Sequence, residues 1–319
     1  MKYLITGSAG FIGFHLTREL LKNNKARIWG IDNINNYYSV NVKKKRNIVL
    51  KKFKNYKFLK IDITDEKKIF DIFQKVKPDI VINLAAQAGV RYSIENPKSY
   101  ISSNLLGFFN ILNLSKEFKV KHFFYASSSS VYGDQKKFPI KINADTNSPL
   151  SLYAATKKSN EIIAESYSNI FNVKCTGFRF FTNYGNFGRP DMSIYKFCEK
   201  MMSNKSIEVF NNGNHKRDFT HISDSVIFLK KIIRKRHHGK GHRIFNIASG
   251  KKIELMKIIK LIEKEMRIPA KINFKKMQRG DVKETHASIS ETVKFTKYKP
   301  TKNINDGIKE FVSWYRNFL

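Results

Sequence analysis

Short apolar runs alternate with longer stretches of helical period through the first half of the chain. Runs rich in branched and aromatic residues, as in β-strands, occur at residues 2–6, 26–32, 56–62, 79–86 and 122–128. Between them, apolar residues recur at helical spacing, most clearly at residues 10–22, 65–76 and 96–118. This alternation is typical of βαβ units, so we expect an α/β fold with a Rossmann-type doubly wound parallel sheet.

The regular alternation ends after one further helix at residues 152–171 and one strand at 173–181. From residue 185 onward Gly, Pro and Asn are frequent. Short strands are predicted at 207–210, 217–221 and 243–249, and helices at 253–265 and 304–318. We therefore expect a Rossmann domain over residues 1–181 and a smaller mixed α/β lobe over 182–319, with the option that part of the chain crosses back between them. Residues 33–55 are polar and lysine-rich, which predicts a loop with a short helix.

Composition is compatible with two domains around a substantial core, since the chain has 319 residues and 41% of them are hydrophobic. No run reaches the roughly 18 consecutive apolar residues of a membrane span, so we predict no membrane association. The segment MKYLITGSAGFIG lacks the features of a secretory signal, and the two cysteines, Cys175 and Cys198, cannot form a disulfide framework. We expect a cytoplasmic protein.

The charge is strongly positive, because 60 Lys and Arg against 26 Asp and Glu leave a formal +34. In a small domain this excess would suggest nucleic-acid binding. Here the basic residues lie in separate segments, such as 43–46, 51–54 and 230–236, and no nucleic-acid-binding motif surrounds them. We interpret the excess as a solvated surface that would attract an anionic small molecule, and we predict no specific nucleic-acid partner.

A glycine-rich loop follows the first predicted strand. Gly7, Gly10 and Gly13 come directly after this strand, and Phe11 and Ile12 begin the first helical pattern. Glycines at this spacing permit a tight turn, a close approach of backbone N–H groups to a pyrophosphate, and packing of the helix on the sheet. An ordinary turn is the alternative.

Carboxylates end the next two strands. Asp32 follows Gly13 by 19 positions, close to the spacing of about 20 at which an acidic residue binds the ribose of a dinucleotide. A carboxylate here favours NAD over NADP, because it would repel a 2′-phosphate. Asp62, with Ile63 beside it, could contact the adenine, or it could belong to the N-cap region of the next helix. With the glycine loop, these residues predict an NAD site.

Tyr153 and Lys157 lie four residues apart on a predicted helix, so their side chains share one face. A nearby ammonium favours the phenolate, which brings a tyrosine toward general-base strength near neutral pH. Ser128, Ser129 and Ser130 end the fifth strand, at the sheet edge where such folds bind ligands. Alone, the pair could be ordinary helix surface and the serines an ordinary turn. Together with the glycine loop, they indicate a catalytic site.

These motifs resemble those of the extended short-chain dehydrogenase/reductases that act on nucleotide sugars. TGSAGFIG, YASSSSVYG and YAATK follow in that order, with Tyr153 25 positions after Ser128. Within this family, LAAQAGVRYS, RFFTNYGNFGRPDM and VFNNGNHKRDFTHISD are similar to the UDP-glucuronate 4-epimerases. The resemblance covers nearly the whole chain, and it implies a nucleotide-sugar 4-epimerase with tightly bound NAD and a homodimeric assembly.

The resemblance also implies roles for individual residues. Tyr153 would be the acid/base, Lys157 would additionally bind the nicotinamide ribose, and Ser128 would hydrogen-bond the reacting O4 of the sugar. The NAD-binding set would be Gly7, Gly10, Phe11, Ile12, Gly13, Asp32, Asp62, Ile63 and Lys157. The substrate-binding set would be Ser129, Ser130, Arg91, Thr182, Arg189 and Arg217. No metal is implied.

Two arginines have the chemistry to bind anionic groups of such a substrate. Arg217 is our candidate for a diphosphate clamp, because a guanidinium binds phosphate oxygens in bidentate fashion. A surface salt bridge with Asp218 or Asp224 is the alternative. Arg189, with Thr182, would bind a sugar carboxylate by the same geometry, and a turn-stabilising role is its alternative.

Other activities stay open at this point. Relatives that dehydrate the sugar usually have an Asp–Glu pair where this chain has Ser129 and Ser130, which argues against elimination. A UDP-glucose or UDP-N-acetylhexosamine 4-epimerase is the second reading, and Arg189 would distinguish it because a neutral hexose offers no carboxylate. A non-catalytic NAD- or RNA-binding protein on the same fold is the remote reading.

Overall fold

The computed structural model describes residues 1–235 and 241–318 of the chain. Contacts divide the chain into two units that alternate along the sequence. Unit 1 comprises Met1–Gly133, Asp145–Phe180 and Leu229–Phe245, and unit 2 comprises Asp134–Ala144, Phe181–Phe228 and Asn246–Leu319. The expected domains were 1–181 and 182–319. Asp134–Ala144 lies within the first expected range but belongs to unit 2, and Leu229–Phe245 lies within the second but belongs to unit 1. Within the described ranges, no helix combines the length and the apolar character that crossing a membrane requires.

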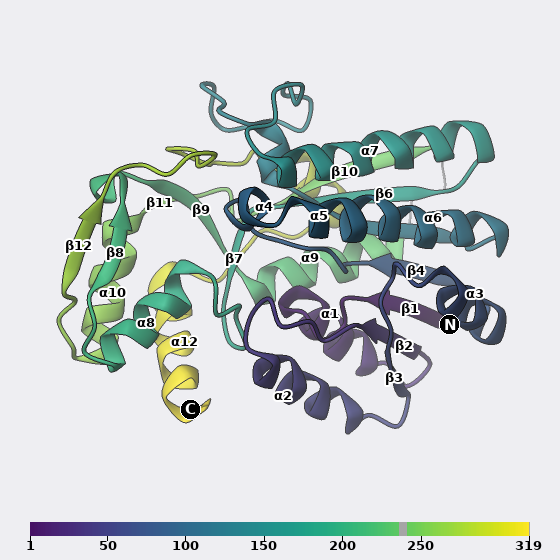
Figure 1. The fold of residues 1–319 in the computed structure, drawn as a ribbon, viewed down its shortest axis with the longest axis horizontal. Coiled ribbons are helices and arrows are strands. Elements are labelled where there is room, and N and C mark those ends of the chain that lie inside the picture. Colours follow the sequence, from purple (N-terminus) through teal and green to yellow (C-terminus); the bar gives the residue numbers. More distant parts are fainter. Residues whose placement is uncertain (236–240, 319) are drawn as a thin grey trace. The chain divides into compact units, whose positions relative to one another are not determined.

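Unit 1 is built on a seven-stranded sheet with the order β10-β6-β5-β4-β1-β2-β3 (Figure 1). The six strands from β1 to β6 pair in parallel. The order reverses beside β1, which confirms the predicted doubly wound sheet of the Rossmann type. The strands are β1 (Lys2–Thr6), β2 (Arg27–Asp32), β3 (Tyr56–Lys60), β4 (Ile80–Asn83), β5 (His122–Ser128), β6 (Cys175–Phe180) and β10 (His242–Ile247).

Helices cover the sheet of unit 1, and their apolar residues meet the central strands. All residues of β4 and β6 are buried, as expected for parallel strands covered on both faces. Leu4, Val81 and Phe123 of the strands form one cluster with Phe73, Phe108 and Ala164 of the helices. These helices are α1 (Phe11–Leu21), α2 (Val40–Lys51), α3 (Glu66–Val76), α6 (Gly107–Glu117) and α7 (Leu152–Phe171).

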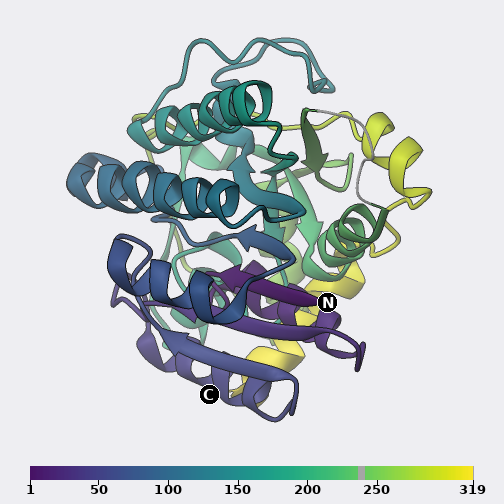
Figure 2. The same cartoon turned by 90° about the vertical axis from the view of Figure 1, so that its right-hand side faces the viewer.

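The helical pattern predicted at residues 96–118 is interrupted in the structure. Two short helices, α4 (Tyr92–Glu95) and α5 (Pro97–Tyr100), lead into a π-helical turn, η1 (Ile101–Leu106), and then into α6. Helices α6 and α7 lie side by side in both views (Figure 1, Figure 2). The Phe109 and Tyr167 rings meet edge to face, 6.3 Å apart, and the Tyr167 hydroxyl donates to Asn113 Oδ1 at 3.2 Å. The predicted helix at residues 152–171 is confirmed as α7.

Unit 2 contains two small sheets. One has the order β11-β9-β7, with β11 antiparallel and β7 parallel to β9, and the other pairs β8 with β12 in parallel. Their side chains pack with those of the helices in a second core that includes Tyr184, Val209, Phe219, Ile258 and Phe311. This confirms the smaller mixed α/β lobe. Its elements are β7 (Thr182–Tyr184), α8 (Ser193–Met202), β8 (Ile207–Phe210), η3 (Asn211–Gly213), β9 (Lys216–His221), β11 (Lys252–Glu254), α10 (Leu255–Met266), β12 (Ile272–Lys275), α11 (Ser290–Thr296) and α12 (Ile304–Phe318), while α9 (Ile222–Lys235) begins in unit 2 and ends in unit 1.

Candidate active site

The glycine-rich loop joins β1 to α1. Gly7 has a φ of +69°, which L side chains rarely adopt, and its carbonyl oxygen accepts the N–H of Gly10 at 2.9 Å. A Cβ on Gly13 would lie 2.0 Å from this same oxygen, far inside van der Waals contact. Only glycine therefore allows the tight turn and the close approach of α1 that the spacing predicted.

The N-terminus of α1 fits the pyrophosphate of a dinucleotide. Gly10 is its N-cap and makes no side-chain capping hydrogen bond. The N–H groups of Phe11 and Ile12, in the first turn, have no acceptor inside the helix. Free donors and the helix dipole together make such an end attractive to phosphate.

Asp32 braces the glycine loop from the end of β2. Its carboxylate accepts the N–H of Ala9 at 3.1 Å and that of Ile34 at 2.9 Å. Burial raises the pKa of this carboxyl, although those two hydrogen bonds and the nearby Lys43 oppose the rise. Arg46 of α2 donates to the Ala9 carbonyl oxygen at 2.9 Å and supports the same loop. Because each carboxylate oxygen accepts up to two hydrogen bonds, Asp32 retains capacity for ribose hydroxyls.

Asp62 and Ile63 follow β3. The Asp62 carboxylate accepts the N–H and the hydroxyl of Thr64, at 2.9 and 2.8 Å, and the amide of Asn33 at 2.6 Å. Burial acts to raise the pKa of Asp62, but these hydrogen bonds outweigh it and lower the pKa. Asp65 is the N-cap of α3, so Asp62 forms the turn before the cap rather than the cap itself. Ile63 is buried.

Tyr153 and Lys157 lie in the first turns of α7, which Ser151 caps by accepting the N–H of Ala154 at 3.1 Å. Lys157 Nζ donates to the carbonyl oxygen of Ala126, on β5, at 2.8 Å. Burial lowers the pKa of Lys157 to about 8, so most of it still carries its proton at neutral pH. The Tyr153 ring packs edge to face on Tyr100, with ring centroids 6.1 Å apart.

The serine cluster lies at the same end of β5. This strand ends at Ser128, and the chain continues as a 3-10 helix, η2 (Ser129–Tyr132). Ser128 Oγ accepts the N–H of Ser130 at 3.1 Å and donates to Ser130 Oγ, also at 3.1 Å, so the predicted alternative of a serine turn describes the backbone here. Since Lys157 bonds to Ala126, two residues before Ser128, the structure brings the serines and the α7 pair to one region of unit 1.

Asn104, which the sequence did not single out, ties this region together. It lies in η1, is buried, and exchanges hydrogen bonds with the Gln87 backbone at 2.8 and 3.0 Å. Its amide also donates to Thr156 Oγ at 3.1 Å, and Thr156 stands between Tyr153 and Lys157 in the sequence. The only local signal was an asparagine inside an apolar helical pattern.

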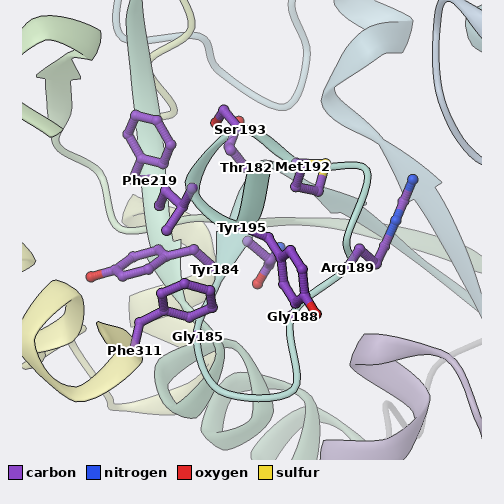
Figure 3. A pocket seen from close by; sticks show the side chains of 12 residues that line it. Thr182, Tyr184, Gly185, Gly188, Arg189, Met192, Ser193, Tyr195, Phe219 and Phe311 are labelled. Carbon is purple, nitrogen blue, oxygen red and sulfur yellow. The ribbon is translucent and has the colours of Figure 1, made fainter. Parts of the chain in front are cut away.

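The remaining expected substrate residues divide between the units. Arg91 is exposed at the start of α4 in unit 1. Thr182 and Arg189 of unit 2 line one small cavity with several aromatic side chains, including Tyr184 and Phe311 (Figure 3). Its volume is about 10 Å³, room for one water molecule.

Arg189 forms an ion pair within its own turn. Its Nε donates to Asp191 Oδ1 at 2.9 Å, and its Nη2 bonds to Asp191 Oδ2. Figure 3 shows the side chain extending away from the aromatic rings of Tyr184 and Phe311. These contacts correspond to the turn-stabilising role that the sequence left open.

Arg217 has a different partner from those we considered. It donates to Asp281 Oδ1 at 2.8 Å, to the Lys283 carbonyl oxygen at 2.9 Å, and to the Val282 carbonyl oxygen. The expected alternative, a salt bridge with Asp218 or Asp224, is therefore wrong. Asp218 accepts the backbone N–H groups of Ser249 and Gly250, at 2.8 and 3.0 Å, and Asp224 accepts the Tyr298 hydroxyl at 2.6 Å, so both carboxylates are engaged elsewhere.

Cys175 and Cys198 are buried and form no disulfide, and burial raises the pKa of each thiol to about 12. Among residues 1–235 and 241–318, no three His, Cys, Asp or Glu side chains gather as metal ligands would. The groups in the region of Ser128 include hydroxyls, a phenol and an ammonium, together with the Glu161 carboxylate that accepts the Ser127 hydroxyl.

Comparisons with known proteins match this arrangement. The model of the NAD dependent epimerase/dehydratase family matches residues 3–248. The chain is 40% identical to the UDP-glucuronate 4-epimerase of Thermodesulfobacterium geofontis, over 98% of this chain and 95% of that protein. It is 38% identical to a probable UDP-glucuronate 4-epimerase of Rhizobium meliloti, over 99% and 97% of the two chains.

A solved structure extends the similarity to the whole fold. The UDP-glucuronic acid 4-epimerase of Bacillus cereus, in complex with UDP-glucuronic acid and NAD, superposes with a TM-score of 0.95 at 30% identity, over the full length of both chains. The resemblance stated from the sequence motifs is therefore confirmed at the level of the family. The chain belongs to the NAD dependent epimerase/dehydratase family.

Proposed function

We propose that this protein is a UDP-glucuronate 4-epimerase that interconverts UDP-glucuronate and UDP-galacturonate with bound NAD. The observation that carries the proposal is the contact of Lys157 Nζ with Ala126 at the end of β5, because it places the Tyr153 helix beside Ser128. The named relatives with this activity, which align over nearly the whole chain, support the choice of substrate.

The residues of unit 1 fit NAD. The glycine loop and the first turn of α1, with Gly7, Gly10, Phe11, Ile12 and Gly13, would hold the pyrophosphate. Asp32 would accept the adenosine ribose hydroxyls, Asp62 and Ile63 would border the adenine, and Lys157 would bind the nicotinamide ribose. Bound there, NAD would supply reversible hydride chemistry at C4 of the sugar, with the hydride returned to the opposite face of the ring.

Tyr153 acts as the general base in the first half of the reaction and as the general acid in the second. It takes the proton of the 4-hydroxyl as the C4 hydrogen leaves as hydride, so a 4-keto sugar forms, and it gives the proton back to O4 when hydride returns. The charged Lys157 stabilises the phenolate, and Ser128 donates a hydrogen bond to O4. No net oxidation results, because both the hydride and the proton return.

The proposal includes the substrate residues expected from the sequence, each within its own unit. Arg91, Ser129 and Ser130 would contact the sugar from unit 1. Arg217 would bind the diphosphate by exchanging its hydrogen bond to Asp281 for one to phosphate, since both are oxyanions. A carboxylate at C6 would compete with Asp191 for Arg189, next to Thr182.

The decisive test is incubation of the purified protein with a panel of UDP-sugars, with product stereochemistry determined by NMR. We expect UDP-glucuronate to give UDP-galacturonate without added NAD and without stoichiometric release of NADH. Better turnover of UDP-glucose or UDP-N-acetylglucosamine than of UDP-glucuronate would favour the alternative, a neutral-sugar 4-epimerase.

Affinity measurements on Arg189→Ala with UDP-glucuronate and with UDP test the carboxylate contact. We expect the variant to bind UDP-glucuronate at least about tenfold more weakly, because a charge-assisted bidentate pair is lost, while UDP affinity stays near that of the wild type. Arg27→Ala, which removes an exposed arginine of β2, is the matched control. If Arg189→Ala bound UDP-glucuronate like the control, the carboxylate assignment would be wrong.

We further propose a homodimer through the outer face of α6 and α7. Large apolar side chains are exposed on both helices, namely Phe109, Ile162, Ile170 and Phe171, with Ile162 and Ile170 55% and 65% exposed. Exposed apolar groups gathered on adjacent helices are typical of an interface. Analytical ultracentrifugation should give a dimer for the wild type and a monomer for Ile162→Glu; a monomeric wild type would contradict the proposal.

We also propose that the protein acts in the cytoplasm. Its two cysteines are buried and form no disulfide, as is common where thiols stay reduced. Recovery of the protein in the soluble cell fraction after spheroplast lysis is the expected result, and recovery from the medium would contradict it.

A further inference from the structure

A buried ion pair lies beside the proposed catalytic segment of unit 1. Arg179 of β6 binds Glu161 of α7 in bidentate fashion, with Nε to Oε1 at 2.8 Å and Nη2 to Oε2 at 2.7 Å. The two side chains are 5% and 3% exposed. Removing both charges from water is costly, and a buried pair often adds little net stability. Its position therefore calls for an explanation in terms of what it touches.

The pair connects the elements that carry Ser128, Tyr153 and Lys157. Glu161 lies one helical turn after Lys157 and two turns after Tyr153, on the same face of α7. Its Oε1 also accepts the hydroxyl of Ser127, the residue before Ser128, at 2.6 Å.

Arg179 completes this connection from β6. It stands opposite Ser127 in the register of β5 and β6. Its guanidinium carbon lies 4.6 Å from the ring centroid of Tyr132, in the 3-10 helix after the serines. One carboxylate and one guanidinium thus link α7, the end of β5, β6 and η2.

We propose that the Arg179–Glu161 pair positions the catalytic residues: it fixes Ser128 relative to the Tyr153 and Lys157 turns of α7, and it keeps the net charge beside them at zero. The identity of the reacting phenol rests on the proposed function. The contacts of the pair do not depend on it.

The charge balance matters because Lys157 is itself buried and its ammonium must act on Tyr153. A lone Glu161 carboxylate would oppose the formation of a phenolate along the helix, and a lone Arg179 guanidinium would favour it. The separation of eight residues corresponds to about 12 Å, short enough for a charge in a protein interior to be felt.

The other titratable groups around the pair leave this balance intact. Tyr125 of β5 and Cys175 of β6 are neutral at working pH, because burial raises the pKa of each. The Tyr125 hydroxyl is further bonded to His242 of β10 at 2.6 Å. Glu165 of α7 is exposed, so solvent screens its charge. Tyr132 contacts Arg179 both through its ring and through a side-chain hydrogen bond.

The test is a charge cycle read out on Tyr153 without substrate. Four proteins are compared: the wild type, Glu161→Gln, Arg179→Gln and the double variant. Each is prepared with and without the additional change Tyr153→Phe. The tyrosinate absorbance of each protein minus that of its Tyr153→Phe counterpart, measured against pH, gives the titration midpoint of Tyr153. We expect the midpoint to fall by about half a pH unit, a threefold change in proton affinity, in Glu161→Gln and to rise similarly in Arg179→Gln. The double variant should titrate like the wild type. Lys121→Gln, which breaks an exposed pair with Asp79, is the control and should shift nothing.

Positioning is read from turnover in the same proteins. The double variant keeps the charge balance but loses the bidentate contact between residues 161 and 179. Its kcat should therefore fall at least about fivefold while KM changes less than twofold. Arg179→Lys keeps the positive charge but can make only a single point contact with Glu161. It should show the same loss of kcat with an unchanged titration midpoint of Tyr153. If a single Gln variant does not fold, the double variant and Arg179→Lys provide the test.

Two results would overturn the proposal: single Gln variants whose midpoints do not move or move in the same direction, or wild-type kcat in both the double variant and Arg179→Lys. Failure of every UDP-sugar to react would instead contradict the proposed function, and the titration would still report on the pair.

Discussion

Replacing Tyr153 with phenylalanine is expected to reduce turnover of UDP-glucuronate at least about a hundredfold while NAD stays bound. General acid–base catalysis contributes about 10²–10⁴-fold, and the variant removes only the hydroxyl that moves the proton. The phenyl ring can keep its edge-to-face contact with Tyr100. Initial rates and the NAD content of the purified variant are the two measurements.

Tyr167→Phe is the matched control for this prediction. Tyr167 lies on the same helix, and its hydroxyl donates to Asn113 at 3.2 Å, so the control also removes one phenolic hydrogen bond from α7. It should retain nearly the wild-type rate. Substantial turnover by Tyr153→Phe would assign the acid/base role to another group.

Gly13→Ala is expected to abolish NAD binding and to destabilise unit 1. The new Cβ would lie 2.0 Å from the Gly7 carbonyl oxygen and 2.8 Å from its carbon, so the loop or α1 must move. Overpacking of this kind typically costs about 1–3 kcal/mol and would disturb the free N–H groups at the start of α1. Isothermal titration with NAD and thermal denaturation of the cofactor-free protein measure the two effects.

Gly10→Ala distinguishes the effect on NAD binding from the effect on the stability of unit 1. A Cβ there would meet only Gly7 backbone atoms within 4 Å, with the carbonyl oxygen 3.0 Å away, so we expect a much smaller loss of melting temperature without NAD than in Gly13→Ala. NAD affinity should still fall, because a methyl group at this position prevents the close approach of a pyrophosphate. If Gly13→Ala bound NAD as tightly as the wild type, the loop would not be the cofactor site.

Local periodicity was sufficient for most of the elements but not for the contacts between distant residues. Two helices, residues 152–171 and 304–318, match α7 and α12 to the residue because their apolar positions recur strongly at helical spacing. The motif residues also lie in the predicted elements, with Asp32 ending β2 and Ser128 ending β5.

Ion pairs were the least predictable part. The partner of Arg217 is Asp281, 64 residues away, whereas we considered only the carboxylates near it in the sequence. Glu161 was not singled out from the sequence, because nothing local reveals that β6 brings Arg179 against it. Burial of a charge depends on a partner that the fold supplies, and periodicity carries no information about that partner.

Helix α2 was longer than the short helix we expected within residues 33–55. It spans 12 residues, and its inward positions include Lys43 and Arg46, which are 5% and 0% exposed. Arg46 is satisfied by the Ala9 carbonyl oxygen and by the Tyr38 hydroxyl, at 2.9 and 2.7 Å. Long basic side chains can line the inward face of a helix with their apolar stems, but they count as polar residues in the sequence. The amphipathic pattern that predicts a helix is therefore not visible in this segment.

The π-helical turn η1 makes the effect of losing one codon depend on where the codon lies. A π turn accommodates one residue more than the α-helix that surrounds it, so the segments on either side keep their rotational phase. Deleting one residue from Ile101–Leu106 would let the turn become α-helical and leave Tyr100 facing Tyr153, with the damage confined to Asn104 and its hydrogen bonds to Gln87. The same deletion inside α6 would rotate everything before it by about 100° and separate Tyr100 from Tyr153, so it should be the more damaging of the two.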